Sequence, residues 1–584
     1  MLKGCVEIFS EEMEQVAAEY GDGEKLIIDN YSLADGTYII VGKSGEVKSY
    51  TIKFNKKTKE MEMNPKNTEI LSKLRFFDYH NRLVTMDKPV DPKKTIHSNS
   101  YLSFWVKKDN LENGKLNQDR INTYFDILVN PKEKYKKPKD RQLYEYIVEK
   151  IGEVDKDKVE SCRKWIQENI FCLDKYGIDI SGKDYLKIFF EEDNELYIKE
   201  EQRYVVPKIF NKNDYNVEID GRIYGLSNDN LALNSKKPYL ENKTQKMSIP
   251  TLISLEDAMN QRKFFDYLMN QANAGNTSLF FDYEHKKILT KDELKNKEFT
   301  GYFLQIKKGT EVGIYHQDVI VNFHYKLRKT FDYDNILESK DEEERYKEYR
   351  SVDGIEGVID EVLFSKWLKS NYFTDALDFG KLGLSGELKR NLIESRERIF
   401  SWLYKGENGN IGQVLYKVCM SMVKSSIKNG YISKAQQQFN LLCSFEKYFG
   451  GENMADKYTQ IRNKLRTKIN GKEEYVIESD TEYLYAVGQL IDYYISLSKA
   501  SKKTHSLANP FFNAMDDRRL KEKLQQYFLK YNYCIEFKSP RFNRLYNMIN
   551  GYDLEGKVVV QDMIAGYLSS SLIYEKNKEN EEEA

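Results

Sequence analysis

The stretch that divides this chain into two kinds of structure is DEEERYKEYR, residues 341–350. Before it, short runs rich in β-branched and aromatic residues, separated by Gly, Asn and Asp, predict strands and hairpins mixed with helices. After it there is no convincing strand, and apolar residues recur at helical spacing, as in Leu520, Leu524, Phe528 and Tyr531. The sequence therefore predicts an α+β fold, with a mixed α/β region containing antiparallel strands (residues 1–350) followed by an all-α helical bundle (residues 351–584).

The individual elements follow from the same patterns. In the first region we expect helices at 6–20, 144–173 and 256–274, and strands at 25–28, 37–41, 47–54, 97–108, 185–190, 196–206, 278–283, 301–307 and 312–314. In the second region we expect helices at 355–370, 386–405, 411–428, 433–449, 454–469, 481–499, 516–535, 540–549 and 559–574.

Composition narrows the classes of protein. The 584 residues carry a net charge of −1, which argues against a uniformly basic protein that coats nucleic acid but allows local basic patches. The six Cys are scattered without a C-x-x-C pair, which is typical of reduced thiols in the cytosol. The first residues lack the apolar core of a signal peptide, and no apolar run is long enough to span a membrane. We therefore expect a cytoplasmic protein.

Motifs for catalysis are absent from the sequence. Residues 36–44 (GTYIIVGKS) approach a phosphate-binding loop, but five residues rather than four separate the glycines, and they favour a strand. The six His are dispersed, without the spacing of a metal hydrolase, and no nucleophile elbow occurs. The sequence thus predicts neither an enzyme nor a cofactor nor a metal site. Carboxylates brought together by folding leave a nuclease, or another enzyme that processes nucleic acid, as an alternative.

A polar loop at residues 225–246 (GLSNDNLALNSKKPYLENKTQK) is the most informative stretch for binding. Asn can pair with adenine edges, whereas Lys reaches guanine acceptors or phosphates. The candidate contacts are Asn228, Asn230, Asn234, Ser235, Lys236, Lys237, Asn242, Lys243 and Lys246. The alternative interpretation is a solvated loop in a protein rich in Asn and Lys.

Two further sets of cations suit nucleic acid. Residues 131–141 (PKEKYKKPKDR) form a basic loop kept out of a helix by its prolines, and it would offer phosphate contacts with one stacking ring. Its candidates are Lys134, Tyr135, Lys136 and Lys137. Near helix ends in the second region, a groove for a single strand could be formed by Lys502, Lys503, Arg518, Arg519, Arg541 and Arg544. Ordinary solvated loops and helix faces are the alternative for both sets.

Five segments, in order along the chain, carry a resemblance to a known family. They are HSNSYLSFWVKK (97–108), GLSNDNLALNSKKPYLENKT (225–244), QRKFFDYLMNQ (261–271), YLYAVGQLIDYYISLSKASKKTHS (483–506) and PRFNRLYNMINGY (540–552). Together they resemble the large subunit of the subtype I-B CRISPR interference complex, Cascade. None is a short universal motif, and it is the ordered set, spread over most of the length of the chain, that carries the resemblance.

The resemblance implies a non-catalytic subunit of a ribonucleoprotein complex. Such a subunit recognises the short motif that flanks the target (the PAM) on double-stranded DNA, promotes duplex opening and guide pairing, stabilises the displaced strand and helps recruit a helicase–nuclease. The implied partners are the guide RNA, the target DNA, the backbone and handle-gripping subunits, and small subunits. In this interpretation residues 1–350 provide the contacts near the guide handle and the PAM. Some relatives carry paired cysteines that could hold zinc, whereas this chain does not.

The resemblance also implies that the 3′ end of the gene can yield a separate small subunit by internal translation. Residues 450–454 (GGENM) can be encoded GGA-GGA-GAA-AAT-ATG, which places a ribosome-binding sequence before an in-frame start at Met454. Residues 454–584 would then be made separately, and they resemble the small subunit. Alternatively, the two glycines are only a turn, and the whole chain is a scaffold that does not contact DNA.

Overall fold

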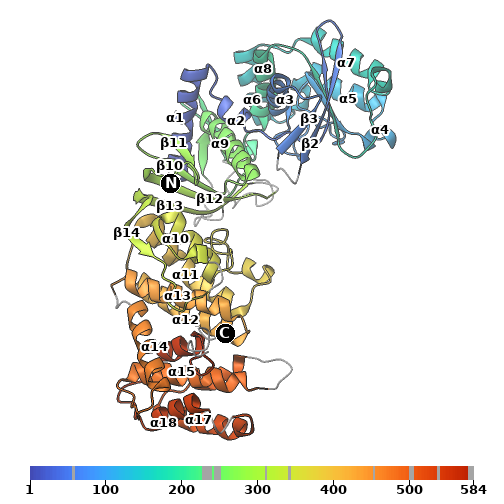
Figure 1. The fold of residues 1–584 in the computed structure, drawn as a ribbon. Coiled ribbons are helices and arrows are strands. Elements are labelled where there is room, and N and C mark those ends of the chain that lie inside the picture. The colour runs from blue at the N-terminus through green and yellow to red at the C-terminus, as the bar shows by residue number, and fades with distance from the viewer. Residues whose placement is uncertain are drawn as a thin grey trace. The chain divides into compact units, whose positions relative to one another are not determined.

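The computed structural model describes residues 1–55, 60–226, 240–242, 251–309, 312–339, 343–450, 454–498, 505–535 and 539–575. The fold is α+β, with sheets concentrated in the first part of the chain and helices in the last (Figure 1). The chain divides into two compact units. The N-terminal unit comprises residues 1–294 and 300–319, and the C-terminal unit comprises residues 295–299 and 320–584.

The N-terminal unit contains a five-stranded sheet of order β3-β2-β1-β5-β4. Its strands are β1 (Gly36–Val41), β2 (Val47–Asn55), β3 (Glu60–Asn64), β4 (Ser103–Lys107) and β5 (Tyr185–Phe190). β1 runs parallel to β5, and the other neighbours are antiparallel. Every residue of β1 is buried, as expected for a central strand covered on both faces. The near-miss phosphate loop at 36–44 is therefore largely this strand, as its β-branched residues predict.

A second five-stranded sheet, of order β11-β10-β12-β13-β8, follows later in the chain. Its strands are β8 (Leu240–Asn242), β10 (Ser278–Asp282), β11 (Lys287–Thr290), β12 (Glu298–Lys307) and β13 (Val312–His324). A three-stranded antiparallel sheet is formed by β6 (Val217–Ile219), β7 (Arg222–Leu226) and β9 (Leu252–Ser254). Helices α1 (Leu2–Tyr20) and α9 (Leu255–Ala274) pack against each other, and α1 also packs against β10 and β11.

The other helices of the N-terminal unit lie around the first sheet, except α2, which contacts α1, α3 and α9 (Figure 1). They are α2 (Lys25–Ile28), α3 (Thr68–Asn81), α4 (Asp109–Glu112), α5 (Gln118–Val129), α6 (Pro138–Ile151), α7 (Lys156–Asn169) and α8 (Asn194–Val205). One buried apolar core extends through the unit, from Cys5 of α1 to Ile314 of β13.

The C-terminal unit contains an antiparallel pair of strands, β14 (Lys326–Asp332) and β15 (Glu348–Ser351). Its helices are α10 (Val352–Val358), α11 (Gly386–Lys405), α12 (Ile411–Lys428), α13 (Ile432–Tyr448), α14 (Met454–Asn470), α15 (Asp480–Ser496), α16 (Asn509–Phe512), α17 (Asp517–Tyr531), α18 (Pro540–Asn550) and α19 (Val560–Leu568). This strand pair packs on α10 and α13. The change from mixed strands and helices to helices alone, which the sequence predicted near residue 350, therefore falls inside the C-terminal unit.

Several sequence-based elements need correction. β15 is a strand beyond residue 341, where we expected none. Residues 25–28 form helix α2 rather than a strand, and residues 196–206 lie largely in helix α8. Several buried side chains of α8 are charged, such as Glu200, Glu201 and Arg203. The buried face of this helix therefore does not appear in the sequence as apolar residues at helical spacing.

Other predicted elements exist with different bounds. The helix expected at 144–173 is two helices, α6 and α7, because Gly152 (φ 86°) ends the first of them. Of the strand expected at 97–108, only β4 (Ser103–Lys107) forms a strand. The helix expected at 355–370 is replaced by α10 and a π-helical turn at Ile359–Leu363. Among the described residues, no helix is both long enough and apolar enough to cross a membrane.

Candidate nucleic-acid interface

The basic stretch at 131–141 is ordered, and two of its candidate residues face inward. The Lys134 ammonium donates to the carbonyls of Pro89 (2.6 Å) and Val90 (2.8 Å), and its burial lowers the pKa to about 8. The Tyr135 ring is only 7% exposed and stacks on Tyr144 with centroids 5.2 Å apart. Its hydroxyl accepts from the buried Lys208 ammonium (2.9 Å). The expectation that Lys134 binds phosphate and Tyr135 stacks on a base is therefore corrected, because the Tyr135 ring is buried and the half-buried Lys134 ammonium already binds two carbonyls.

The other two candidates of this stretch remain at the surface. Lys136 is exposed, and Lys137 is exposed but forms an ion pair with Asp214 (3.0 Å). The hydrogen bond to that carboxylate raises the pKa of Lys137. The prolines also act differently from our expectation. Pro131 begins a short 3-10 helix and Pro138 begins α6, because the first turn of a helix tolerates a residue without an N–H.

Most of the polar loop at 225–246 lies outside the described residues. This applies to Asn228, Asn230, Asn234, Ser235, Lys236, Lys237, Lys243 and Lys246. Asn242 is described only through its backbone, which ends strand β8 and pairs in parallel with Ile314 of β13.

The C-terminal cations fall into separate groups. Lys502 and Lys503 lie outside the described residues. Arg518 and Arg519 lie in the first turn of α17 and pair with Glu522 (3.1 Å) and Asp516 (3.4 Å). In contrast, Arg541 donates to Asn470 (2.7 Å) and Arg544 donates to the carbonyl of Ile469 (2.9 Å), so both bind the C-terminal end of α14. Arg541 and Arg544 of α18 thus serve contacts between helices rather than an open groove.

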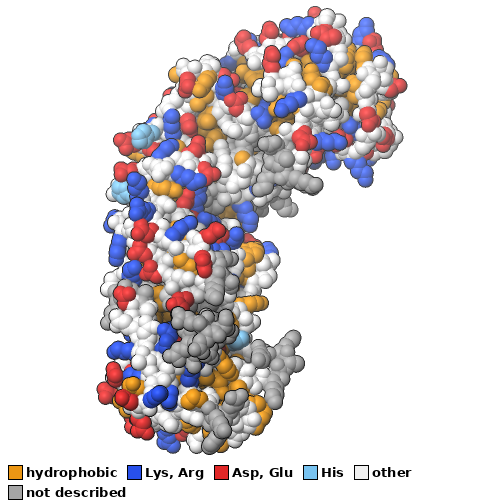
Figure 2. All heavy atoms as spheres, viewed as in Figure 1, with side chains coloured by type: hydrophobic (Ala, Val, Ile, Leu, Met, Phe, Trp, Pro, Cys, Tyr) orange, Lys and Arg blue, Asp and Glu red, His pale blue; other side chains and the backbone are white. Residues whose placement is uncertain are grey.

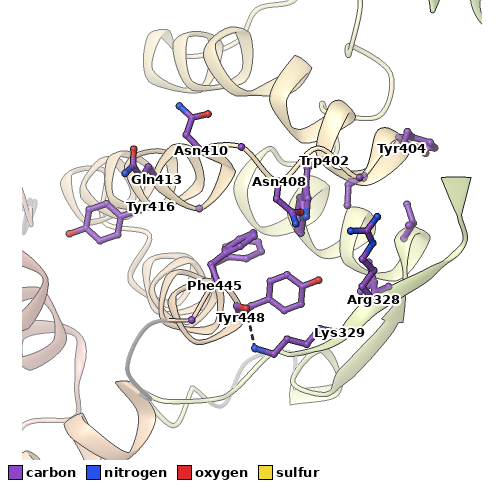
Figure 3. Close-up of a pocket in the computed structure, with 18 of the residues that line it drawn as sticks. Arg328, Lys329, Trp402, Tyr404, Asn408, Asn410, Gln413, Tyr416, Phe445 and Tyr448 are labelled. Atoms are coloured by element: carbon purple, nitrogen blue, oxygen red, sulfur yellow. Dashed lines mark hydrogen bonds between the residues drawn. The ribbon is translucent and has the colours of Figure 1, made fainter. Parts of the chain in front are cut away.

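The structure contains a cavity of about 1140 Å³ in the C-terminal unit that the sequence patterns did not predict (Figure 3). The lining comes from the end of β13, β14, Val352 of α10, the end of α11, the loop at 406–410, the start of α12 and the end of α13. These segments are far apart in the sequence, so only the fold brings their side chains together. The cavity is therefore a candidate site in its own right.

Aromatic rings form one side of this cavity. Trp402, which is 6% exposed, lies 5.4 Å from the Phe449 ring and 6.0 Å from the Tyr448 ring. Tyr448 and Phe449 meet edge to face at 5.0 Å. Tyr416 of α12 is more accessible, at 36%, and therefore offers a free ring surface.

Polar and cationic groups complete the lining. Asn408, Asn410 and Gln413 are exposed amides on the 406–410 loop and the first turn of α12 (Figure 3). The lining cations are Lys326, Arg328 and Lys329 of β14 and Lys417 of α12, with His324 beside them. Glu446 is the single acid among the lining residues that the structure describes, and it accepts from Gln561 (2.7 Å).

Three of these cations have no partner within the described part of the chain. Lys329 donates to the carbonyl of Tyr448 (3.1 Å), a bond drawn in Figure 3. Lys326, Arg328 and Lys417, by contrast, form no ion pair or hydrogen bond with any residue that the structure describes. The cavity therefore combines free cations with accessible aromatic and amide groups, which is the set of groups that binds a nucleotide's phosphate and base.

The face of the molecule that Figure 2 shows carries charges of both signs. Figure 2 shows acidic and basic side chains interspersed over the visible face of each unit. This agrees with the net charge of −1 and indicates that any anion-binding site is local.

Comparisons with known proteins give no relative for this chain: no family model, no curated protein and no solved structure matches it.

Proposed function

We propose that this chain is the non-catalytic large subunit of a subtype I-B Cascade, acting in the cytoplasm. The observation that carries the proposal is the ordered set of five family-like segments along the sequence. In this role the chain recognises the PAM on double-stranded DNA, promotes duplex opening and guide pairing, stabilises the displaced strand and helps recruit a helicase–nuclease.

The position of these segments in the fold is compatible with that resemblance. Residues 261–271 lie in α9, residues 483–506 begin in α15, and residues 540–552 contain most of α18. Tyr267, Tyr485 and Phe542 of these helices are buried, so the segments include core positions that specify the fold.

The region proposed to resemble the small subunit also has its own packing. Helix α14 begins at Met454, and α15 packs extensively on α19 and also contacts α14, α17 and α18. Lys468 of α14 binds Glu482 of α15 with a buried ion pair of 2.8 Å. These contacts support the proposal that residues 454–584 can be made as a separate helical product.

The first test is purification of the tagged native gene product, co-expressed with its neighbouring genes. We expect the full-length chain, guide-sized RNA, partner subunits and a fragment that begins at Met454. Synonymous codons at Gly450 and Gly451 that remove GGAGG should abolish the fragment without changing the full-length protein. Equivalent synonymous changes at Gly406 and Gly409 serve as the control. A solitary chain without RNA or partners would contradict the Cascade proposal and favour a free-standing enzyme.

The DNA contact is tested separately in the assembled complex. Lys236→Glu with Lys237→Glu should weaken target binding and flatten its salt dependence, because two phosphate contacts are lost. Lys156→Glu with Lys164→Glu, at two exposed positions of α7, makes the same charge change elsewhere. Equal binding by the two double variants would favour a scaffold that does not use this loop on DNA.

A further inference from the structure

We propose that the cavity between β14, α11, α12 and α13 binds unstacked nucleotides of a single nucleic-acid strand, with bases against its aromatic rings and phosphates on Arg328, Lys326 and Lys417. This inference rests on the proposed nucleic-acid-binding function and adds a specific site to it. The site is separate from the loops that the sequence singled out.

The aromatic side supplies a surface for bases. Tyr416 of α12 is an accessible ring in the lining, and Trp402, Tyr448 and Phe449 of α11 and the end of α13 form a packed cluster elsewhere in it. Each base has a π-face that can stack on such a ring, so this interaction is independent of sequence. Because Trp402, Tyr448 and Phe449 contact one another, this cluster is preorganised for stacking.

The amides supply hydrogen bonds to base edges or to sugars. Asn408 and Asn410 flank Gly409, whose positive φ of 33° turns the loop that lines the cavity. An amide offers both donors and an acceptor, and it can therefore pair with several bases. Gln413 extends this polar edge along α12, as Figure 3 shows.

The cations are arranged for a chain of phosphates. Arg328 and Lys326 come from β14, whereas Lys417 comes from α12, so positive charge stands on two different walls. None of the three is neutralised by a described residue, and the one lining acid, Glu446, is held by Gln561. Unpaired cations on separate walls favour an occupant with more than one phosphate.

The size of the cavity favours a strand over a free nucleotide. Pockets for small ligands typically measure about 300–1,000 Å³. The cavity exceeds that range at about 1140 Å³, and several of its lining residues are exposed. A strand that passes through an open site fits these dimensions better than a single enclosed ligand does.

The test uses the full-length chain and a fluorescent single-stranded 12-mer, with binding followed by anisotropy at several salt concentrations. Arg328→Ala with Lys417→Ala should weaken binding at least fivefold and reduce the salt slope by about 1.4, at about 0.7 per lost phosphate contact on a single strand. Tyr416→Ala should weaken binding by about tenfold. Arg390→Ala with Lys428→Ala, two exposed cations of α11 and α12 outside the cavity, should bind like the wild type.

Photocrosslinking identifies the site directly. A 12-mer carrying 5-iodouracil should crosslink to peptides containing Trp402, Tyr416 or Tyr448, and excess AMP should compete poorly. Equal binding by the cavity and control variants, while the wild type still binds the strand, would overturn this inference and leave the Cascade proposal standing. AMP binding as tight as strand binding would overturn the strand assignment in favour of a free nucleotide. Absence of any binding or crosslink would also overturn the inference about the cavity. The Cascade proposal is tested independently, by whether guide RNA co-purifies with the chain.

Discussion

Gly488 of α15 and Gly566 of α19 lie against each other where the two helices cross. A Cβ atom placed on Gly488 would lie 3.0 Å from the carbonyl carbon of Gly566 and 2.7 Å from the backbone nitrogen of Tyr567. A Cβ on Gly566 would overlap the carbonyl oxygen of Tyr485. Backbone atoms block both positions, so a larger residue can be accommodated only if one helix moves away from the other.

We therefore expect Gly488→Ala and Gly566→Ala each to destabilise the C-terminal unit by about 1–3 kcal/mol, the usual cost of overpacking. Urea unfolding of the full chain measures the effect. Gly386→Ala is the matched control, because Gly386 is also helical but a Cβ atom placed on it would meet no described atom within 4 Å. That control should be neutral or slightly stabilising. Unchanged stability in the two crossing variants would mean that the helices are not packed this closely.

The sequence predicted the fold best where amphipathic helices have clear ends. Helix α11 agrees with the predicted bounds, because Ser385 caps its start and Gly406, at φ 69°, ends it. The prediction failed where the buried side chains are polar. In α8, Glu201 is buried and binds Arg262 (2.8 Å), a partner on a distant helix that no local pattern reveals.

The candidate site was less predictable than the fold. Arg328, Trp402 and Tyr448 come from three separated segments, so their proximity is a property of tertiary packing alone. The burial of Lys134 and Tyr135 likewise depends on carbonyls and rings contributed by other elements. A local signal did exist in the Gly- and Asn-rich loop at 406–410, since such loops often expose amide side chains.

The two neighbouring lysines of the basic stretch should behave differently. Lys134→Met removes the donor for the carbonyls of Pro89 and Val90, and leaving such acceptors unsatisfied costs about 1–3 kcal/mol. Lys136→Met, at an exposed position, should change stability by less than about 0.5 kcal/mol. Urea unfolding and hydrogen exchange of peptides covering residues 84–96 measure the effect. Equal protection of these peptides in both variants would place the Lys134 ammonium in solvent instead.

Only two of the six cysteines should react rapidly with a thiol reagent in the native protein. Cys5, Cys162, Cys419 and Cys443 are buried, and burial raises the pKa of Cys5 and Cys162 to about 12. Because the thiolate is the reactive form, these groups should be slow, whereas Cys172 and Cys534 are partly exposed. Titration with the thiol reagent at pH 8 should modify about two thiols rapidly in the native protein, and all six after denaturation. Cys172→Ser and Cys534→Ser should each remove one fast equivalent, and a third fast thiol would contradict the packing.

Glu12 should make the stability of the N-terminal unit depend on pH. Its carboxylate accepts from the backbone N–H of Ile288 (3.0 Å), and burial raises its pKa from 4.5 to about 7. Below pH 4.5 the group is protonated in both states, so its full contribution to stability is present. As pH rises through 7 that contribution is lost, because the unfolded chain ionises more readily than the folded one.

Glu12→Gln keeps an acceptor for Ile288 but cannot ionise. The free energy of unfolding of the variant should therefore increase relative to that of the wild type as the pH increases. Urea unfolding should give similar stabilities near pH 4.5 and an advantage for the variant of up to about 3 kcal/mol at pH 8, from about 1.4 kcal/mol per pKa unit. Glu14→Gln, at an exposed position of the same helix, removes the same charge and should show no such pH-dependent gain. If both variants changed equally with pH, the cause would be the net charge of the chain. The partly buried contact between Glu12 of α1 and Ile288 of β11 would then play no part in the effect.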